Sequence, residues 1–238
     1  FFLVGCSTKK VTLDPVIMGG AESSYQGAYT STTDILHTKL DVSFDWDSAF
    51  VIGKATIDAK PYFYPMNKAV LNANGFQIKK VALLQNEDQR PLQYSYNGKL
   101  LTITLDKTYS TDEKFTLYID YVAMPHKLQE GVDIATKGDR GLYFIDRNSK
   151  DLSKRQIWTQ GETECNSNWF PTVNGPHEKM TQEISITVPE RYTTLSNGEL
   201  EFSSLNGNGT RTDSWRMEKP HSTYLTMLAA GNFTVTKD

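Results

Sequence analysis

Disulfide bonds, membrane-spanning helices and a nucleic-acid surface all lack support in this sequence. It contains two cysteines, Cys6 and Cys165, too few for a disulfide framework. No window approaches the ~18 consecutive apolar residues of a membrane-spanning helix. Its 25 lysines and arginines and 28 aspartates and glutamates are scattered, without the basic stripe that nucleic-acid binding needs. We therefore expect a globular domain with no nucleic-acid partner.

A sustained helical period is also missing, whereas apolar and polar residues often alternate. The first alternating run places these apolar side chains on one face: Leu36, Leu40, Val42, Phe44 and Trp46. Further strands are predicted at 50–64, 69–71, 78–84, 94–96, 101–103, 115–121, 141–145, 156–164, 181–188, 191–195, 212–217 and 224–229. Asn97-Gly98 accepts positive φ at both turn positions and predicts a hairpin, and residues 203–214 are interpreted as a solvated hairpin loop. This pattern predicts an all-β, antiparallel sandwich of roughly a dozen strands.

The first residues carry a separate signal. Leu3-Val4-Gly5-Cys6 resembles a bacterial lipobox, in which the peptide is cut before the cysteine and the cysteine is acylated. Because a polar, turn-rich stretch follows, we expect residues 1–33 to hold a signal remnant, the lipobox and a tether, with the folded domain at 34–238. We therefore expect Cys6 to be a lipid attachment site that anchors the chain to a membrane of the bacterial cell envelope, facing the periplasm or the surface.

Motifs for catalysis or metal binding are sparse. The four histidines, at positions 37, 126, 177 and 221, are too far apart to share a helix turn, and we assign no metal site in this chain. Neither a Gly-x-Ser-x-Gly elbow nor a phosphate-binding glycine loop is present. No catalytic residue is therefore expected here.

The polar stretch 158–164 stands out. On a strand, Gln160, Glu162 and Glu164 would project to one face, and Gly161 would let another backbone approach closely. Neighbouring carboxylates repel unless they are solvated or face a cation. The stretch is therefore either an exposed polar strand face or a site that binds an ammonium group.

The same region resembles the first domain of the aminopeptidase N family, which belongs to the gluzincin zinc metallopeptidases. Thr159-Gln160-Gly161-Glu162, Phe170-Pro171, Pro176 and Lys179 match the family pattern Thr-Gln-x-Glu/Gln…Phe-Pro-Cys-x-Asp-Glu-Pro…Lys without gaps. Later matches follow in family order: Ile184 to Pro189, Ser196-Asn197-Gly198, Trp215, Pro220, Ser222-Thr223-Tyr224-Leu225 and Gly231-Asn232-Phe233. The resemblance covers about residues 34–235.

Two departures from the family pattern concern the loop that follows this stretch. Where relatives have Cys-x-Asp-Glu-Pro, residues 172–176 read Thr-Val-Asn-Gly-Pro. Ser167 or Asn168 stands in place of a family arginine. Since the family residues are expected to brace the loop, its packing in this chain must differ.

The resemblance implies both a fold and a role. The domain would be a saddle-shaped β-sandwich that packs against a downstream catalytic domain, and zinc would be bound in that domain rather than by this chain. Glu162 would bind the free α-ammonium group of a peptide substrate, while Gln160 and Gly161 would contact the substrate at its first side-chain pocket. We expect this chain alone to hydrolyse nothing.

A non-catalytic, lipid-anchored module that binds peptide or glycan is the alternative. A glycan would need a planar aromatic platform, which the aromatic residues at 62–64 and at 94 and 96 could supply. Packing within the strand core explains those aromatic residues more simply. Zinc ligands in sequence beyond Asp238 would distinguish the enzyme from the module.

Overall fold

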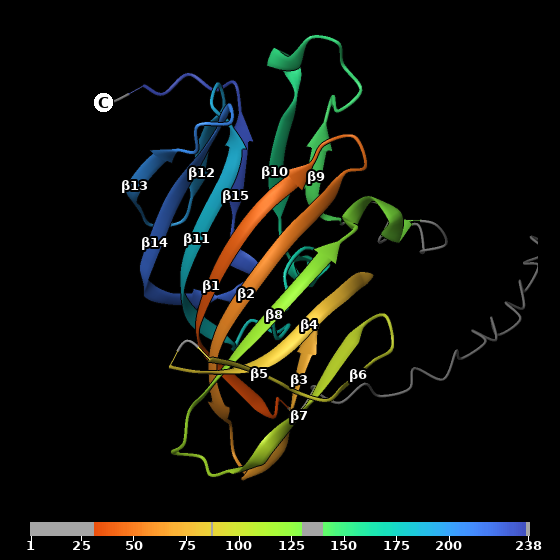
Figure 1. Ribbon diagram of the computed structural model, residues 1–238, viewed down its shortest axis with the longest axis vertical. Coiled ribbons are helices and arrows are strands. Elements are labelled where there is room, and N and C mark those ends of the chain that lie inside the picture. Colours follow the sequence, from red (N-terminus) through yellow and green to blue (C-terminus); the bar gives the residue numbers. More distant parts are fainter. Residues whose placement is uncertain (1–30, 87, 130–139, 237–238) are drawn as a thin grey trace, which may run out of the picture. The chain divides into compact units, whose positions relative to one another are not determined.

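The computed structural model describes residues 31–86, 88–129 and 140–236, where the regular structure consists of strands and short 3-10 helices (Figure 1). The helices are η1 (Pro125–Gln129), η2 (Leu152–Lys154), η3 (Cys165–Asn168) and η4 (Thr223–Leu225). Within these ranges, no helix is long and apolar enough to cross a membrane. Cys6 and most of the predicted tether lie outside the described residues. The predicted all-β class is confirmed.

The largest sheet has eight strands in the order β13-β14-β11-β1-β2-β8-β4-β5. Its strands are β1 (Thr33–Asp45), β2 (Phe50–Pro61), β4 (Phe76–Gln85), β5 (Asp88–Pro91), β8 (Phe115–Ala123), β11 (Lys179–Pro189), β13 (Glu199–Leu205) and β14 (Thr210–Ser222). β1 and β11 are parallel, with Leu40 opposite Ile184, so the sheet is mixed rather than purely antiparallel. Strands so far apart in sequence need no hairpin turn and are free to pair in either direction.

Two smaller sheets complete the sandwich. The four-stranded sheet, in the order β12-β15-β10-β9, contains β9 (Gly141–Ile145), β10 (Gln156–Gln160), β12 (Thr193–Ser196) and β15 (Leu228–Gly231). The three-stranded sheet, in the order β3-β7-β6, contains β3 (Met66–Asn72), β6 (Tyr94–Tyr96) and β7 (Leu100–Tyr109). In Figure 1 the first lies with the upper part of the large sheet and the second with its lower part.

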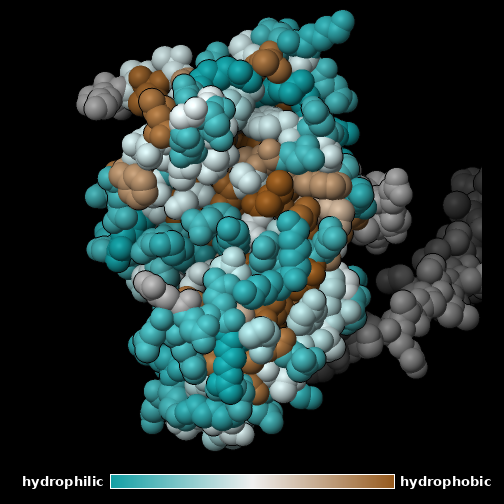
Figure 2. Space-filling model, viewed as in Figure 1, coloured by the Kyte–Doolittle hydropathy of each residue, from teal (hydrophilic) through white to brown (hydrophobic). Residues whose placement is uncertain are grey.

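The core lies between these sheets and follows from the alternation of residues along each strand. The large sheet contributes Ile57 and Leu117, the three-stranded sheet Ile103, and the four-stranded sheet Ile157, all fully buried. Each such side chain contributes about 1.5–3 kcal/mol through burial. Figure 2 shows one face of the molecule, which is mostly hydrophilic, with a strip of hydrophobic residues that runs from its middle toward the lower end.

The first strand departs from the predicted pattern at Leu36. A β-bulge shifts the β1–β2 register between Ile35 and His37, so Leu36 is only half-buried and Thr38 takes the inward position. Beyond the bulge, Leu40 points into the core as predicted. An extra residue in one strand moves all earlier side chains to the other face, which strict alternation cannot reveal.

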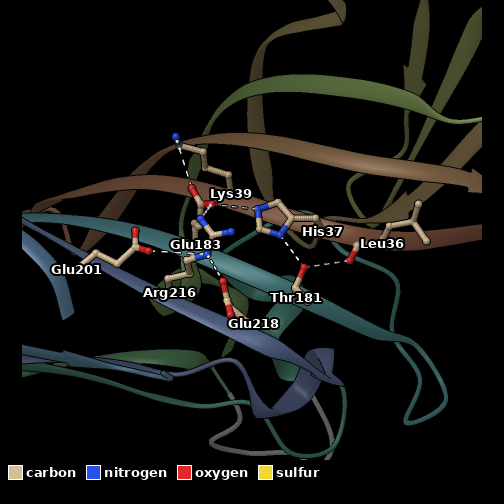
Figure 3. Close-up of polar contacts among 8 residues, drawn as sticks. All are labelled: Leu36, His37, Lys39, Thr181, Glu183, Glu201, Arg216 and Glu218. Atoms are coloured by element: carbon tan, nitrogen blue, oxygen red, sulfur yellow. Dashed lines mark hydrogen bonds and ion pairs between the residues drawn. The ribbon is translucent and has the colours of Figure 1, made fainter. Parts of the chain in front are cut away.

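Charged residues gather around Glu183 where β1, β11 and β14 run side by side (Figure 3). Its carboxylate lies 3.0 Å from Arg216 Nη1, 3.6 Å from Lys39 Nζ and 3.8 Å from His37 Nε2. His37 Nδ1 lies 2.7 Å from Thr181 Oγ1. Such partly exposed pairs contribute less than about 1 kcal/mol each to stability. The cluster links the side chains of β1, β11 and β14 on the solvent-facing side of the sheet.

Two hairpins occur where the sequence contains turn-forming residues. The predicted turn at Asn97-Gly98 joins β6 to β7, and Gly98 has a φ of 90°. The predicted 203–214 loop is a tighter hairpin than expected, because β13 extends to Leu205 and pairs with β14. Sequence reasoning missed β13, although Leu200 and Phe202 alternate with polar residues; all seven residues of the strand are exposed.

Candidate functional site

The polar stretch predicted as one strand changes structure after Gln160. β10 ends there, residues 162–164 form a turn, and η3 begins at Cys165. The prediction that Gln160, Glu162 and Glu164 share one strand face is therefore wrong. The chain turns at Gly161, whose carbonyl accepts a hydrogen bond from Cys165 N at 2.9 Å. All three side chains are nevertheless exposed.

A small pocket of about 170 Å³ opens at this turn. Its lining residues come from two segments of the chain: Thr159, Gln160, Gly161 and Glu162 from the first, and Tyr224, Leu225, Thr226 and Met227 from the second. Among these eight residues, only Glu162 carries a charge. The volume is below the ~300–1,000 Å³ typical of complete ligand sites. A carboxylate beside neutral side chains favours a small cation.

Gly161 brings the two segments of the pocket into contact. A Cβ atom added there would lie 2.2 Å from the Tyr224 carbonyl oxygen and 2.6 Å from the side chain of Asn166. Only glycine fits where another backbone approaches so closely. The close approach predicted for this glycine is confirmed, and its partner is the Tyr224 backbone.

Replacing Gly161 with alanine is expected to lower the free energy of unfolding by about 1–3 kcal/mol, because the new methyl group overlaps a backbone carbonyl. Urea unfolding of the Gly161→Ala protein measures this change. Thr163→Ala, an exposed substitution in the same turn, is the control and should stay within about 0.5 kcal/mol of wild type. Equal stability of the two variants would contradict the close approach.

The side chain of Asn166 ties the turn to the second segment. Its Nδ2 donates to the carbonyl oxygens of Thr223 (2.8 Å) and Thr226 (2.9 Å). Its Oδ1 accepts from the indole Nε1 of Trp169, also at 2.8 Å. Asn166 is 1% exposed and Trp169 is fully buried, so these bonds form away from water. The position of Glu162 therefore depends on a rigid, buried framework below it.

The second segment is also held from its other side. Asn197 Oδ1 accepts from Met227 N at 2.7 Å, and Asn197 Nδ2 donates to the Leu225 carbonyl at 3.1 Å. Gln182 Oε1 accepts from Thr226 Oγ1 at 2.9 Å. An irregular segment between η4 and β15 is thus ordered by side-chain hydrogen bonds to its backbone.

The loop that departs from the family pattern has its own brace. Asn74 Nδ2 donates to Ser167 Oγ (2.9 Å) and to Asn168 Oδ1 (2.8 Å). Asn72 exchanges backbone hydrogen bonds with Thr172, at 2.6 and 3.0 Å. Asn72 at the end of β3 and Asn74 just after it therefore hold the loop that departs from the family pattern.

Metal ligands do not converge in the described parts of the chain. Residues 31–86, 88–129 and 140–236 contain no group of three or more histidine, cysteine, aspartate or glutamate side chains placed to hold a metal ion. A zinc site with the usual three or four protein ligands does not fit these residues.

The fold and the pocket together define a β-sandwich domain with one carboxylate, that of Glu162, in the lining of a pocket beside a braced turn. The chain matches the peptidase M1 N-terminal domain over residues 23–225, and it belongs to that family. The resemblance to the aminopeptidase N family is thereby confirmed.

Three curated relatives resemble the chain. Aminopeptidase B of Rattus norvegicus is 22% identical over 220 residues, which cover 84% of this chain and 31% of that protein. Aminopeptidase N of Acetobacter pasteurianus is 25% identical over 202 residues, covering 81% and 51%. Transcription initiation factor TFIID subunit 2 of Schizosaccharomyces pombe is 25% identical over 198 residues, covering 73% and 16%. The chain thus spans about half or less of the length of these relatives.

Solved structures show the same fold. An M1 zinc metallopeptidase from Deinococcus radiodurans has a TM-score of 0.69 and 17% identity, and the match covers 85% of this chain and 43% of that chain. Native yeast LTA4 hydrolase has a TM-score of 0.65 and 18% identity, covering 87% and 30%. A variant of the Deinococcus radiodurans protein was solved with a Tyr-Ser-Ala substrate.

The structure places Gln160, Gly161 and Glu162 together at the pocket. Their assignment to substrate binding stays a prediction. Sequence reasoning missed the second segment, because residues 224–229 were predicted as a strand. The segment instead forms η4 and an irregular link before β15 begins at Leu228. The glycine was the available signal, because a glycine between polar residues implies a backbone partner without identifying it.

Proposed function

We propose that this chain is the first domain of a zinc aminopeptidase that removes amino-terminal residues from peptides. In this proposal, Glu162 binds the α-ammonium group of the substrate. The observation that carries it is the charge of the pocket, where Glu162 is the one ionised residue and is held on a turn braced by Asn166. Membership of the peptidase M1 N-terminal domain family supports the reaction class.

Electrostatics explains why an exposed carboxylate suits this role. Two opposite charges 4 Å apart attract by about 1 kcal/mol in water and by about 4 kcal/mol at the effective dielectric constant of a partly enclosed site. Glu162 is exposed in this chain. Its attraction for an ammonium group would become strong only when a second domain closes over the turn and excludes water.

Gln160 and Gly161 would contact the substrate beside the ammonium group. The Gln160 side chain is exposed at the pocket and offers both a hydrogen-bond donor and an acceptor. Across the pocket, Leu225 is 49% exposed and supplies an apolar surface. These groups would line part of the pocket for the first side chain of the peptide.

Zinc would be held by a downstream catalytic domain, since the described residues of this chain do not fit a metal site. When bound there, the metal would supply the activated water for peptide hydrolysis. The task of this chain would be to hold the amino end of the peptide in place, so that its first peptide bond lies at the metal.

Activity of the full-length polypeptide tests the proposal. We expect hydrolysis of an aminoacyl-anilide that a chelator abolishes, and we expect Glu162→Ala to lower kcat/KM at least about tenfold, equivalent to ~1.4 kcal/mol. Glu164→Ala removes another exposed carboxylate from the same turn, one that does not line the pocket, and should have little effect. Equal losses in both variants would contradict a specific role for Glu162.

A non-catalytic interaction module remains the second candidate, favoured by the similarity to a transcription initiation factor subunit. A full-length protein that stays inactive with zinc supplied would support it. Peptide is a better ligand for such a module than glycan, because the aromatic rings of Tyr62 and Phe63 meet edge to face rather than forming a flat platform.

We also propose that Cys6 is lipid-attached and anchors the chain to a membrane of the bacterial cell envelope, facing the periplasm or the surface. The supporting observation is the Leu3-Val4-Gly5-Cys6 pattern ahead of a polar stretch. Mass spectrometry of the protein made in a bacterial host would detect the acyl groups, and their loss in Cys6→Ser would assign the site.

A further inference from the structure

An aromatic loop protrudes where β2 ends. β2 was predicted to reach Tyr64, but the strand ends at Pro61, and Tyr62, Phe63, Tyr64 and Pro65 form a loop before β3. Phe63 is 65% exposed and Tyr64 is 80% exposed. Packing in the strand core, the simpler explanation from sequence, is therefore wrong for these two residues. Two adjacent, exposed aromatic side chains indicate a surface that meets something apolar.

The other aromatic cluster has a structural role. Tyr96 is half-buried, and its hydroxyl donates to the Ala73 carbonyl (2.6 Å) and accepts from Phe76 N (2.7 Å). That tyrosine therefore fixes the link between β3 and β4. The aromatic loop lacks such a task within the sandwich, since its most exposed rings point away from the core.

The position of the aromatic loop points to its partner. Tyr62 N donates to the Thr32 carbonyl at 3.0 Å, and Pro61 pairs with Thr33 at the start of β1. The chain therefore enters the domain directly beside the loop. In Figure 1 the end of β2 lies at the lower end of the domain, whereas the residues after β15 lie at the upper end.

We propose that the aromatic loop contacts the surface of the lipid bilayer to which Cys6 tethers the chain. The 24 residues between Cys6 and Ser31 could span at most about 80 Å when extended, so a lipid anchor alone would leave the orientation of the domain open. Aromatic side chains favour the membrane–water interface, where their rings are apolar and their polar ends stay hydrated. This proposal rests on the lipid attachment proposed above.

Two lysines near the loop are paired with acidic residues. Lys60, which precedes it, lies 3.6 Å from Asp34, and Lys107 on β7 pairs with Glu113. Because these lysines have acidic partners, they offer little attraction to anionic lipids. Binding through the aromatic loop should therefore persist at about 0.5 M salt, which screens interactions between exposed charges.

Vesicle flotation tests the proposal without the anchor. The full chain carrying Cys6→Ser is mixed with vesicles of phosphatidylethanolamine and phosphatidylglycerol, and its partition coefficient is measured at low and high salt. We expect Phe63→Ser with Tyr64→Ser to weaken partition about tenfold. Phe202→Ser is the matched control, because Phe202 is 55% exposed on β13, and it should leave partition unchanged.

Insertion depth gives an independent measurement. Brominated lipids in the vesicles should quench the fluorescence of the tryptophan introduced by Phe63→Trp, but not of the one introduced by Phe202→Trp. The native tryptophans give the same background fluorescence in both variants. Equal partition of the loop variant and the control, or no quenching at position 63, would overturn the proposal. Self-association through the loop, detected by sedimentation without vesicles, would also overturn it.

The anchor is tested separately, in cells. Wild-type chain in the membrane fraction and Cys6→Ser in the soluble fraction would support lipid attachment, whatever the vesicles show. If both variants are soluble, the anchor proposal fails, and vesicle binding by the aromatic loop still tests the contact. The two failures are therefore distinguishable.

Discussion

Replacing Asn166 with alanine is expected to lower the free energy of unfolding by about 3 kcal/mol or more. The substitution removes the partners of the Thr223 and Thr226 carbonyls and of the Trp169 indole N–H. Each buried polar group left without a partner costs about 1–3 kcal/mol. Urea unfolding with tryptophan fluorescence follows the effect, because Trp169 is fully buried beside the site.

The matched control is Asn206→Ala in the β13–β14 turn. Asn206 also makes side-chain hydrogen bonds, to Thr210 Oγ1 (3.0 Å) and Thr212 Oγ1 (3.1 Å), but it is exposed to water. Its loss should cost less than about 1 kcal/mol. If Asn166→Ala and Asn206→Ala lower the free energy of unfolding equally, the hydrogen bonds of Asn166 do not form the buried framework described above.

Glu178→Gln is expected to stabilise the protein above pH 7 and to stabilise it much less near pH 5. Glu178 is 1% exposed and adjoins the site through the hydrogen bond from Thr223 N to its carbonyl. Burial raises the pKa of its carboxyl to about 7, with Asp34 adding to the rise and the hydrogen bond from Ile35 N opposing it. Its Oε2 is buried without a hydrogen-bond partner.

The raised pKa of Glu178 determines how stability changes with pH. Between the unfolded value of about 4.3 and the folded value of about 7, the folded state binds more protons than the unfolded state. The contribution of Glu178 to stability is therefore complete at low pH and is lost as the pH rises to 7. The loss is on the order of 3–4 kcal/mol by pH 8, and glutamine removes it because it stays neutral.

Unfolding free energies at pH 5 and pH 8 measure this effect. The difference between wild type and Glu178→Gln should be full at pH 8 and fall to about 1 kcal/mol at pH 5. Glu190→Gln, which changes an exposed carboxyl just after β11, should have the same stability as wild type at both pH values. A constant difference between wild type and Glu178→Gln at both pH values would show that Glu178 does not titrate in this range.

Much of the fold could be predicted from local sequence patterns, but the pairing of strands distant in sequence could not. Alternation identified most strands, and Asn97-Gly98 identified a hairpin, because both depend on neighbours in sequence. The parallel pairing of His37 with Thr181 joins residues 144 apart, and no local signal encodes its direction. The bulge at Leu36 escaped for a different reason, because an inserted residue breaks the two-residue period.

Only one of the two segments that line the candidate site could be predicted from the sequence. Gln160, Gly161 and Glu162 could be singled out, because a glycine between polar residues and a family pattern both mark them. The opposite wall lies more than sixty residues later and is irregular, with Tyr224 in η4. Its order comes from Asn166 and Asn197, whose roles depend on where they lie in space.

Inhibition of the full-length protein tests the central claim, that Glu162 binds the substrate ammonium group. We would measure the inhibition constants of an amino acid amide and of its analogue without the α-amine, for wild type and for Glu162→Ala. We expect wild type to prefer the amine at least about tenfold, and Glu162→Ala to lose that preference by binding only the amine more weakly. A preference for the amine that survives in Glu162→Ala would contradict the claim.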